Sequence, residues 1–118
     1  MKKRYIILLL LVLCLASLFG VWNHQHSFTK EKWTENPEQR TKIVDDLLED
    51  HLRIGMTKEE VLALLGGNES GGEVPIIPEG DQWVYWMGSE RGLISIDSEW
   101  LLVEFQDDLV AGYDIVTD

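Results

Sequence analysis

The sequence has a single cysteine, Cys14, among its 118 residues. No internal disulfide can form, so packing alone must stabilise the fold. Basic residues are also scarce, because ten Lys and Arg stand against 21 Asp and Glu and give a formal net charge of −11. This acidity argues against nucleic-acid binding and predicts repulsion from anionic lipid headgroups. We therefore expect partners with neutral or basic surfaces, although acidity can also serve solubility alone.

Residues typical of catalytic or metal sites are few. His24 and His26 form a His-x-His pair with no further Cys or His nearby in the sequence, so we interpret the pair as part of a linker. His51 is expected at the boundary of an apolar stripe. Asp97 and Glu99 resemble a carboxylate pair, but such residues are common at strand ends. The sequence thus predicts no cofactor, no metal site and no enzymatic activity.

An apolar run extends from Ile6 to Trp22 and follows three basic residues. This is the layout of an export signal or of an N-terminal membrane anchor. A helix of this length is roughly 26 Å long at about 1.5 Å per residue, close to the ~30 Å of a hydrocarbon core. The charge bias predicts a protein of the cell membrane, with the chain after residue 22 on the extracytoplasmic side.

Three fates of this segment remain open. An uncleaved anchor explains best why the apolar run continues past Cys14. Cleavage by an ordinary signal peptidase is compatible with the small residues Cys14 and Ala16 at the −3 and −1 positions. Lipidation of Cys14 as the first mature residue is the third fate, but the bulky Leu13 stands where Gly, Ala or Ser is normal.

The sequence divides into three parts. Residues 1–22 form the signal or anchor segment, residues 23–36 are expected to be a linker that becomes ordered near Trp33, and residues 37–118 are expected to form one α+β domain. About 90 residues follow the apolar run, which is enough for one small core and not for two.

Two helices are predicted at the start of the domain. Apolar residues at helical spacing indicate a helix over about residues 37–53. A second helix is predicted over 58–65, where Thr57 and Glu60 form a capping box and Gly66 is a left-handed terminator. Gly55 is the predicted terminator of the first helix. Met56 and Val61 have the spacing of a hydrophobic staple at the start of the second helix.

The pattern becomes strand-like after a loop over residues 66–81 that is rich in Gly, Pro and acidic residues. Strands are predicted over residues 82–87, 93–96, 100–105 and 109–116, the last two joined by a tight turn. Two helices followed by three or four antiparallel strands predict a two-layer α+β sandwich, with both helices packed on the same face of the sheet.

A Gly-Met-Thr helix start, a Val-x-x-Leu-Leu-Gly helix, an aromatic strand and a hydrophobic strand ending in Phe occur in this order. The residues concerned are Gly55, Met56, Thr57, Val61, Leu64, Leu65, Gly66, Trp83, Tyr85 and Phe105. Over about residues 40–116 the chain resembles the BamE-like (SmpA/OmlA) domain of bacterial envelope proteins. The resemblance implies an α-α-β-β-β sandwich and a binding module rather than an enzyme. The best-known members are lipoproteins that serve as accessory subunits in outer-membrane protein assembly, and related folds inhibit β-lactamase by binding it.

The first predicted strand is apolar on both of its faces. Helices cover only one face of the sheet, so either Val84 and Trp86 or else Trp83 and Tyr85 must face outward. An exposed aromatic patch on a sheet is a frequent partner site. Our candidate partner-binding residues are therefore Trp83, Tyr85, Trp86 and Trp100, although most aromatics of a small domain fill its core.

The sequence as a whole predicts an exported, membrane-tethered, non-enzymatic protein-binding module of the bacterial cell envelope, with an assembly or adaptor role. It would attach to the membrane through residues 6–22 and bind a protein partner in the envelope. One alternative is an inhibitor or immunity-type protein that binds a basic enzyme or toxin. A second alternative is a small metal-binding protein or hydrolase.

Overall fold

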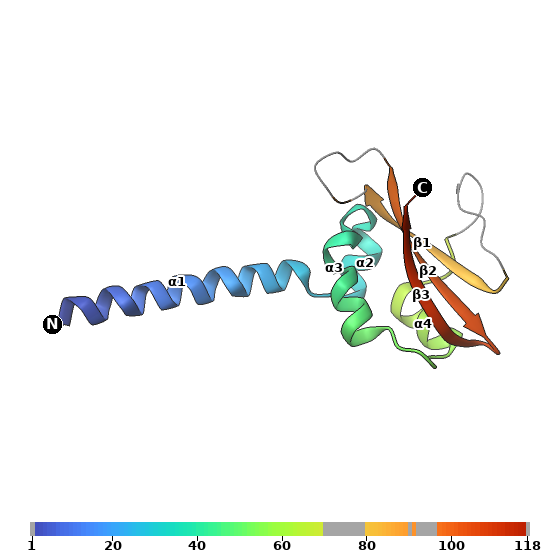
Figure 1. The fold of residues 1–118 in the computed structure, drawn as a ribbon, viewed down its shortest axis with the longest axis horizontal. Helices are drawn as coiled ribbons and strands as arrows, with labels where there is room; N and C mark the ends of the chain where they lie inside the picture. Colours follow the sequence, from blue (N-terminus) through green and yellow to red (C-terminus); the bar gives the residue numbers. More distant parts are fainter. Residues whose placement is uncertain (1, 70–79, 90, 92–96, 118) are drawn as a thin grey trace.

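The computed structural model describes residues 2–69, 80–89, 91 and 97–117. The protein is α+β, with an apolar N-terminal helix, further helices and a three-stranded antiparallel sheet (Figure 1). The elements in chain order are α1 (Lys2–His26), α2 (Lys30–Glu35), the 3₁₀ turn η1 (Pro37–Gln39), α3 (Arg40–Asp46), the π-helical turn η2 (Leu47–His51), α4 (Lys58–Leu65), β1 (Gln82–Ser89), β2 (Ser98–Gln106) and β3 (Leu109–Thr117).

Helix α1 projects away from the rest of the molecule and buries none of its residues (Figure 1). Among the described residues it is the one helix long and apolar enough to cross a membrane, with a mean hydropathy of 2.6. An apolar helix without a buried face has no protein partner that would remove its side chains from water. Its length and composition fit a membrane span or a signal sequence.

The linker predicted over residues 23–36 is instead largely helical. Helix α1 continues to His26, and α2 follows after three residues. Phe28 and Trp33 lie in the hydrophobic core, and Trp33 is completely buried. The sequence did not reveal α2 within this segment, because a six-residue helix with one core residue is too short to show a helical period.

The helix predicted over residues 37–53 is helical as far as His51, but it consists of the three segments η1, α3 and η2. Gly55 has a φ of 91°. We had predicted that Gly55 ends this helix, and this was wrong. Gly55 lies in a separate turn, where its N–H donates to the carbonyl oxygen of Val110 at 2.8 Å. The described part of the chain therefore contains four α-helices, where the prediction had an anchor and two domain helices.

Both predicted ends of α4 are confirmed. The Thr57 hydroxyl accepts a hydrogen bond from the Glu60 N–H at 3.1 Å, and the Thr57 N–H donates to the Glu60 carboxylate at 3.4 Å. Gly66 ends the helix with a φ of 85°. Val61 is buried in the core and Met56 packs against it. These contacts are local, which is why the sequence alone was sufficient to predict them.

The sheet is a meander in the order β1-β2-β3. Its strands match three of the predicted ones and extend beyond them, whereas the strand predicted over 93–96 and most of the loop over 66–81 lie outside the described residues. The predicted turn between β2 and β3 is made by Asp107 and Asp108, with φ values of 54° and 63°. Two consecutive positive φ values are typical of the hairpin turn that matches strand twist.

Helices α2, α3 and α4 lie on one side of the sheet (Figure 1). Register places directly opposed residues on the same face, so Tyr85, Leu101 and Ile115 share one face while Val84, Leu102 and Asp114 share the other. The first face supplies the core together with the helices. The buried cluster consists of Phe28, Trp33, Ile43, Val44, Leu47, Leu52, Val61, Leu65, Tyr85, Met87, Leu101, Val103, Phe105 and Val110.

Candidate functional site

Two of the four candidate partner-binding residues point toward the helices. Tyr85 is completely buried, and its hydroxyl donates to the carbonyl oxygen of Gly66 at 2.8 Å. Burial raises the pKa of this phenol. Trp83 is half-buried, packs against the core and meets Phe105 edge-on with ring centroids 4.9 Å apart. Neither residue belongs to an exposed patch, because strand alternation directs both toward the side that the helices cover.

The other two candidates lie on the opposite face of the sheet, where Trp86 and Trp100 are directly paired across β1 and β2. Trp86 is half-buried, whereas Trp100 is only 7% exposed. The indole N–H of Trp100 has no hydrogen-bond acceptor within the described chain. We call this surface the outer face, and its apolar residues are Val84, Trp86, Trp100, Leu102 and Val116.

A shallow hollow of about 240 Å³ continues the outer face toward its polar end. Leu102 lies opposite Asp114, and Glu104 lies opposite Gly112. The missing side chain of Gly112 leaves the hollow open, and both carboxylates are exposed. An apolar floor beside two carboxylates suits a side chain with an apolar stem and a cationic end, as in Lys or Arg.

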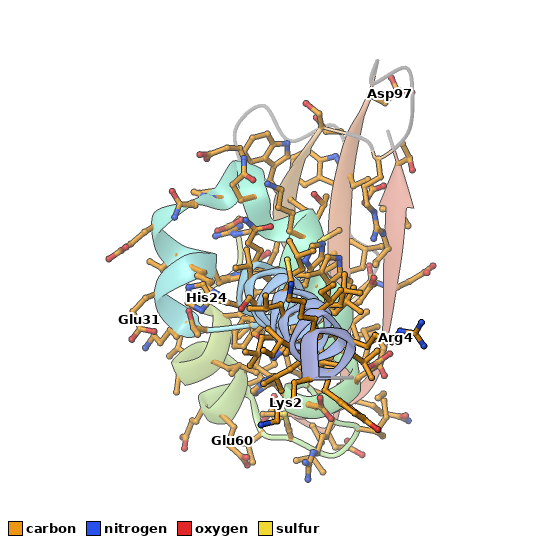
Figure 2. All side chains as sticks on the ribbon, turned by 90° about the vertical axis from the view of Figure 1, so that its left-hand side faces the viewer. Lys2, Arg4, His24, Glu31, Glu60 and Asp97 are labelled. Carbon is orange, nitrogen blue, oxygen red and sulfur yellow. The ribbon has the colours of Figure 1, made fainter. Side chains whose placement is uncertain are left out.

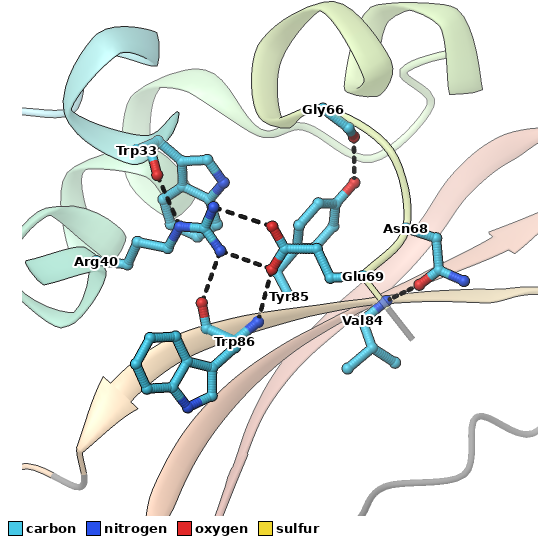
Figure 3. Close-up of polar contacts among 8 residues, drawn as sticks. All are labelled: Trp33, Arg40, Gly66, Asn68, Glu69, Val84, Tyr85 and Trp86. Carbon is cyan, nitrogen blue, oxygen red and sulfur yellow. Dashed lines mark hydrogen bonds and ion pairs between the residues drawn. The ribbon is translucent and has the colours of Figure 1, made fainter. Parts of the chain in front are cut away.

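A buried arginine lies behind the edge strand of this face (Figure 3). Arg40 of α3 is only 3% exposed, and it contacts Glu69 through two hydrogen bonds of 2.7 Å and 3.0 Å. It also donates to the carbonyl oxygens of Trp33 and Trp86, at 2.8 Å and 2.7 Å, and its guanidinium lies 4.5 Å from the centre of the Trp33 ring. These contacts fix α2 and α3 to β1.

Residues just after α4 complete the edge of β1 (Figure 3). The N–H of Val84 donates to the Asn68 side chain at 2.7 Å, and the N–H of Trp86 donates to the Glu69 carboxylate at 3.0 Å. The Glu69 N–H returns a bond of 2.8 Å to the Val84 carbonyl oxygen. Side chains and backbone of a predicted loop thus satisfy groups that an unpaired strand edge would expose.

Our sequence reasoning did not single out Arg40 or Glu69. Arg40 could have been found, because it precedes Val44 and Leu47 by four and seven residues and so shares their helical stripe. A lone cation in an apolar stripe indicates a buried, paired group. Glu69 carries no comparable signal, since it lies in a polar segment without periodicity.

A second polar cluster connects α1 to the domain. The N–H of Phe28 donates to the Asp46 carboxylate at 2.7 Å, and His51 Nε2 lies 3.5 Å from the same carboxylate. The Phe28 hydrogen bond is the main reason that the pKa of Asp46 lies below its usual range, and His51 adds to the effect. The ammonium of Lys32 donates to the carbonyl oxygens of Ser27, at 3.0 Å, and of His24.

The residues considered for catalysis or metal binding are dispersed or already paired. His24 lies exposed on α1, and His26 contacts the Trp22 carbonyl oxygen at 2.8 Å. Glu99 is buried and binds Arg91 at 3.1 Å, whereas Asp97 is exposed. No group of three or more His, Cys, Asp and Glu side chains in the described part of the chain is placed to hold a metal ion.

Two further residues singled out in the sequence are His51 and Cys14. His51 is half-buried beside the core, as predicted, and its ring lies 5.0 Å from that of Phe28. Cys14, the candidate lipidation residue, is exposed on α1.

Comparison with known proteins adds no identification. No family model matches the sequence, and no curated protein matches it.

Proposed function

We propose that this chain is a membrane-tethered, extracytoplasmic and non-enzymatic protein-binding module of the bacterial cell envelope. The observation that carries the proposal is α1, whose apolar run is exposed on every side and leads directly into a packed acidic domain. Lipid is the environment in which such a helix is stable, and the basic N-terminus favours the cytoplasmic side.

The outer face is the proposed docking surface. It presents Trp86, Leu102 and Val116 as half-buried apolar groups, and Glu104 and Asp114 lie at its polar end. Interfaces of this kind combine an apolar centre with a charged rim. The expected partner is a protein segment with apolar residues next to a Lys or Arg, because the carboxylates would attract the cation.

The resemblance to the BamE-like domain is part of this proposal. The order of helices followed by a three-stranded meander supports it, as do the capped α4 and its terminator. We likewise propose that helices and sheet form a two-layer sandwich, in which the outer face lies on the side of the sheet opposite the helices. An experimental structure of the domain, superposed on members of that family, tests both points.

The tether is tested by extraction of cell membranes with alkaline carbonate and by intact-mass measurement of the protein. We expect the chain to stay in the membrane pellet with residues 1–22 still attached. Release by carbonate would overturn the tether, and a mass that begins at an acylated Cys14 would replace the proposed span with a lipid anchor.

The docking face is tested with a photo-reactive residue at position 102 of the full-length protein in native membranes. The matched control carries it at position 62, because Leu62 is an exposed leucine on α4. We expect one protein to crosslink from position 102 and not from position 62, and the crosslink to weaken in the Glu104→Gln and Asp114→Asn double variant. Equal labelling from both positions would contradict docking on the outer face.

The acidic hollow also favours a second candidate function, an inhibitor or immunity-type protein that binds a basic enzyme or toxin. The identity of the crosslinked protein discriminates between the two functions. Envelope assembly components support the adaptor role, whereas a single secreted enzyme or toxin supports the inhibitor.

A further inference from the structure

A second concave site lies where α1 joins the domain. It is a pocket of about 190 Å³, which we call the lysine pocket, and it is lined by Gln25, Lys32, Asn36, Gln39, Lys42 and Ile43. None of these residues is acidic, although the chain contains 21 acidic residues. Two ammonium groups and three amides make the pocket electropositive and rich in hydrogen-bond donors, so its chemistry suits an anion.

Several of these donors are unused. Within residues 2–69, 80–89, 91 and 97–117, the side chains of Gln25, Gln39 and Lys42 take part in no hydrogen bond or ion pair. The Lys32 ammonium has three N–H groups and donates to two carbonyl oxygens, so one donor remains. An anion in the lysine pocket could therefore accept hydrogen bonds from these groups without breaking existing contacts.

The position of the pocket relative to the membrane indicates which anion it can bind. Gln25 follows Trp22, the last residue of the apolar run, by three residues, or roughly 4.5 Å of helix. The polar headgroup layer on each side of a bilayer is roughly 5 to 8 Å thick. With α1 in the membrane, Gln25 and the pocket lie at headgroup level. Figure 2 looks along α1 onto this end of the domain, where His24 lies beside α2 and Asp97 lies far from the axis.

The charges around the end of α1 are separated. Acidic residues line a neighbouring hollow together with Trp22 and His26: Asp45, Asp46, Glu49 and Asp50. Lys42 borders both concavities but forms no ion pair with these carboxylates or with any other described residue. The repulsion from anionic headgroups predicted from net charge treats the domain as a single charge. The membrane end of the domain instead carries a basic pocket next to an acidic hollow, with Lys42 on the border of both.

We propose that the lysine pocket binds the phosphate group of a membrane phospholipid and so fixes the domain against the bilayer surface. Lys42 would supply a charge-assisted hydrogen bond, and the amides of Gln25 and Gln39 would donate to further phosphate oxygens. The inference rests on the proposed function, because a lipid phosphate is at this height only if α1 lies in the membrane.

The test measures binding to the full chain in neutral detergent by native mass spectrometry and thermal unfolding. Short-chain phosphatidic acid is the phosphate-bearing probe, the matching diacylglycerol lacks the phosphate, and inorganic phosphate lacks the acyl chains. Lys42→Gln removes the unpaired cation. Lys30→Gln is the matched control, since Lys30 is an exposed lysine of α2 outside the pocket. Lys32 is left unchanged because it also holds the end of α1.

We expect phosphatidic acid to bind and to raise the unfolding temperature, and diacylglycerol to do neither. Lys42→Gln should weaken binding about tenfold, the loss expected for one charge-assisted hydrogen bond, and Lys30→Gln less than twofold. Equal effects of the two substitutions would show diffuse attraction, and equal binding of inorganic phosphate would show a soluble-anion site. Either result, or no binding, overturns the proposal. Carbonate extraction tests the membrane tether separately. A failure of the tether is therefore distinguishable from a failure of phosphate binding in the lysine pocket.

Discussion

Arg40 and Glu69 form a two-bonded ion pair across 29 residues of sequence, with nitrogen–oxygen distances of 2.7 Å and 3.0 Å. The two partners differ in environment, since the Arg40 side chain is 4% exposed and that of Glu69 is 35% exposed. When the pair is broken, the Glu69 carboxylate can be solvated by water, whereas the buried Arg40 guanidinium cannot. Loss of Glu69 would therefore leave a buried cation without its counter-charge, which is the costly way to break such a pair.

We predict that Glu69→Ala lowers the free energy of unfolding by about 3 kcal/mol, the lower end of the cost of breaking a buried pair. The Arg40→Met, Glu69→Ala double variant should lose at least about 1 kcal/mol less than the sum of the single losses, because the two residues are coupled. Urea unfolding of the full chain in mild detergent, followed by tryptophan fluorescence, measures both quantities.

The control for this cycle is Glu35→Ala, which removes an exposed carboxylate at the end of α2. It should change the free energy by no more than about 0.5 kcal/mol. Additive losses for Arg40 and Glu69 would show that the pair contributes no coupling.

Gly88 lies where β1 passes η1. Its φ is 102°, and a Cβ atom at this position would be 2.7 Å from the backbone oxygen of Glu38. Gly88→Ala should therefore destabilise the domain by about 2 kcal/mol or more, from backbone strain and a clash with rigid backbone. Gly67→Ala is the control, because its nearest contact would be an ordinary 3.8 Å to Leu62. Comparable thermal unfolding of the two variants would disprove the close approach.

The β2–β3 turn predicts a rank order of stability at position 107. Asp107 adopts a φ of 54°, which glycine tolerates without strain, aspartate accepts and β-branched residues oppose. Asp107→Gly should leave stability unchanged or slightly higher, whereas Asp107→Val should lower it by about 1 to 2 kcal/mol. Chemical denaturation of the three proteins gives the order, and a valine variant as stable as the parent would contradict the turn geometry.

Asp46 predicts a pH dependence of stability. Its pKa is lowered in the folded state by the Phe28 N–H hydrogen bond, so its contribution is present above the unfolded pKa of about 3.9 and is lost as pH falls through the folded value. Asp46→Asn should therefore be less stable than the parent at pH 6, and the difference should narrow as the pH falls below 4.

Thermal unfolding between pH 6 and pH 3 measures this difference. Asp45→Asn is the control, because Asp45 is 75% exposed and lies 3.7 Å from Arg91 in a surface pair. A constant difference between the parent and Asp46→Asn across this range would show that Asp46 does not titrate with folding.

Local features of the fold were predictable from the sequence. The Thr57–Glu60 capping box, the Gly66 terminator and the turn after Gln106 depend on contacts within three or four residues, and all three are present. The three described strands follow from a change of period and from β-favouring residues. The helix α2 was missed because six residues carry no readable period.

The candidate site was only partly predictable. Alternation showed that Trp83 and Tyr85 share one face of β1 and that Trp86 lies on the other. It did not show which face the helices cover, because both faces are apolar. That depends on how α3 and α4 pack on the sheet, which is decided by long-range contacts such as the one between Arg40 and Glu69.

The sequence by itself determined an acidic chain without disulfides, an apolar N-terminal helix and the capped helix between Thr57 and Gly66. These features depend on composition or on neighbours along the chain. The tertiary structure alone decided that Phe28 and Trp33 belong to the core and that the outer face carries Trp86. It also decided that hydrogen-bond donors without a partner among the described residues gather at the end of α1. Such arrangements arise from contacts between distant segments, whose free energies are realised only when the chain is folded.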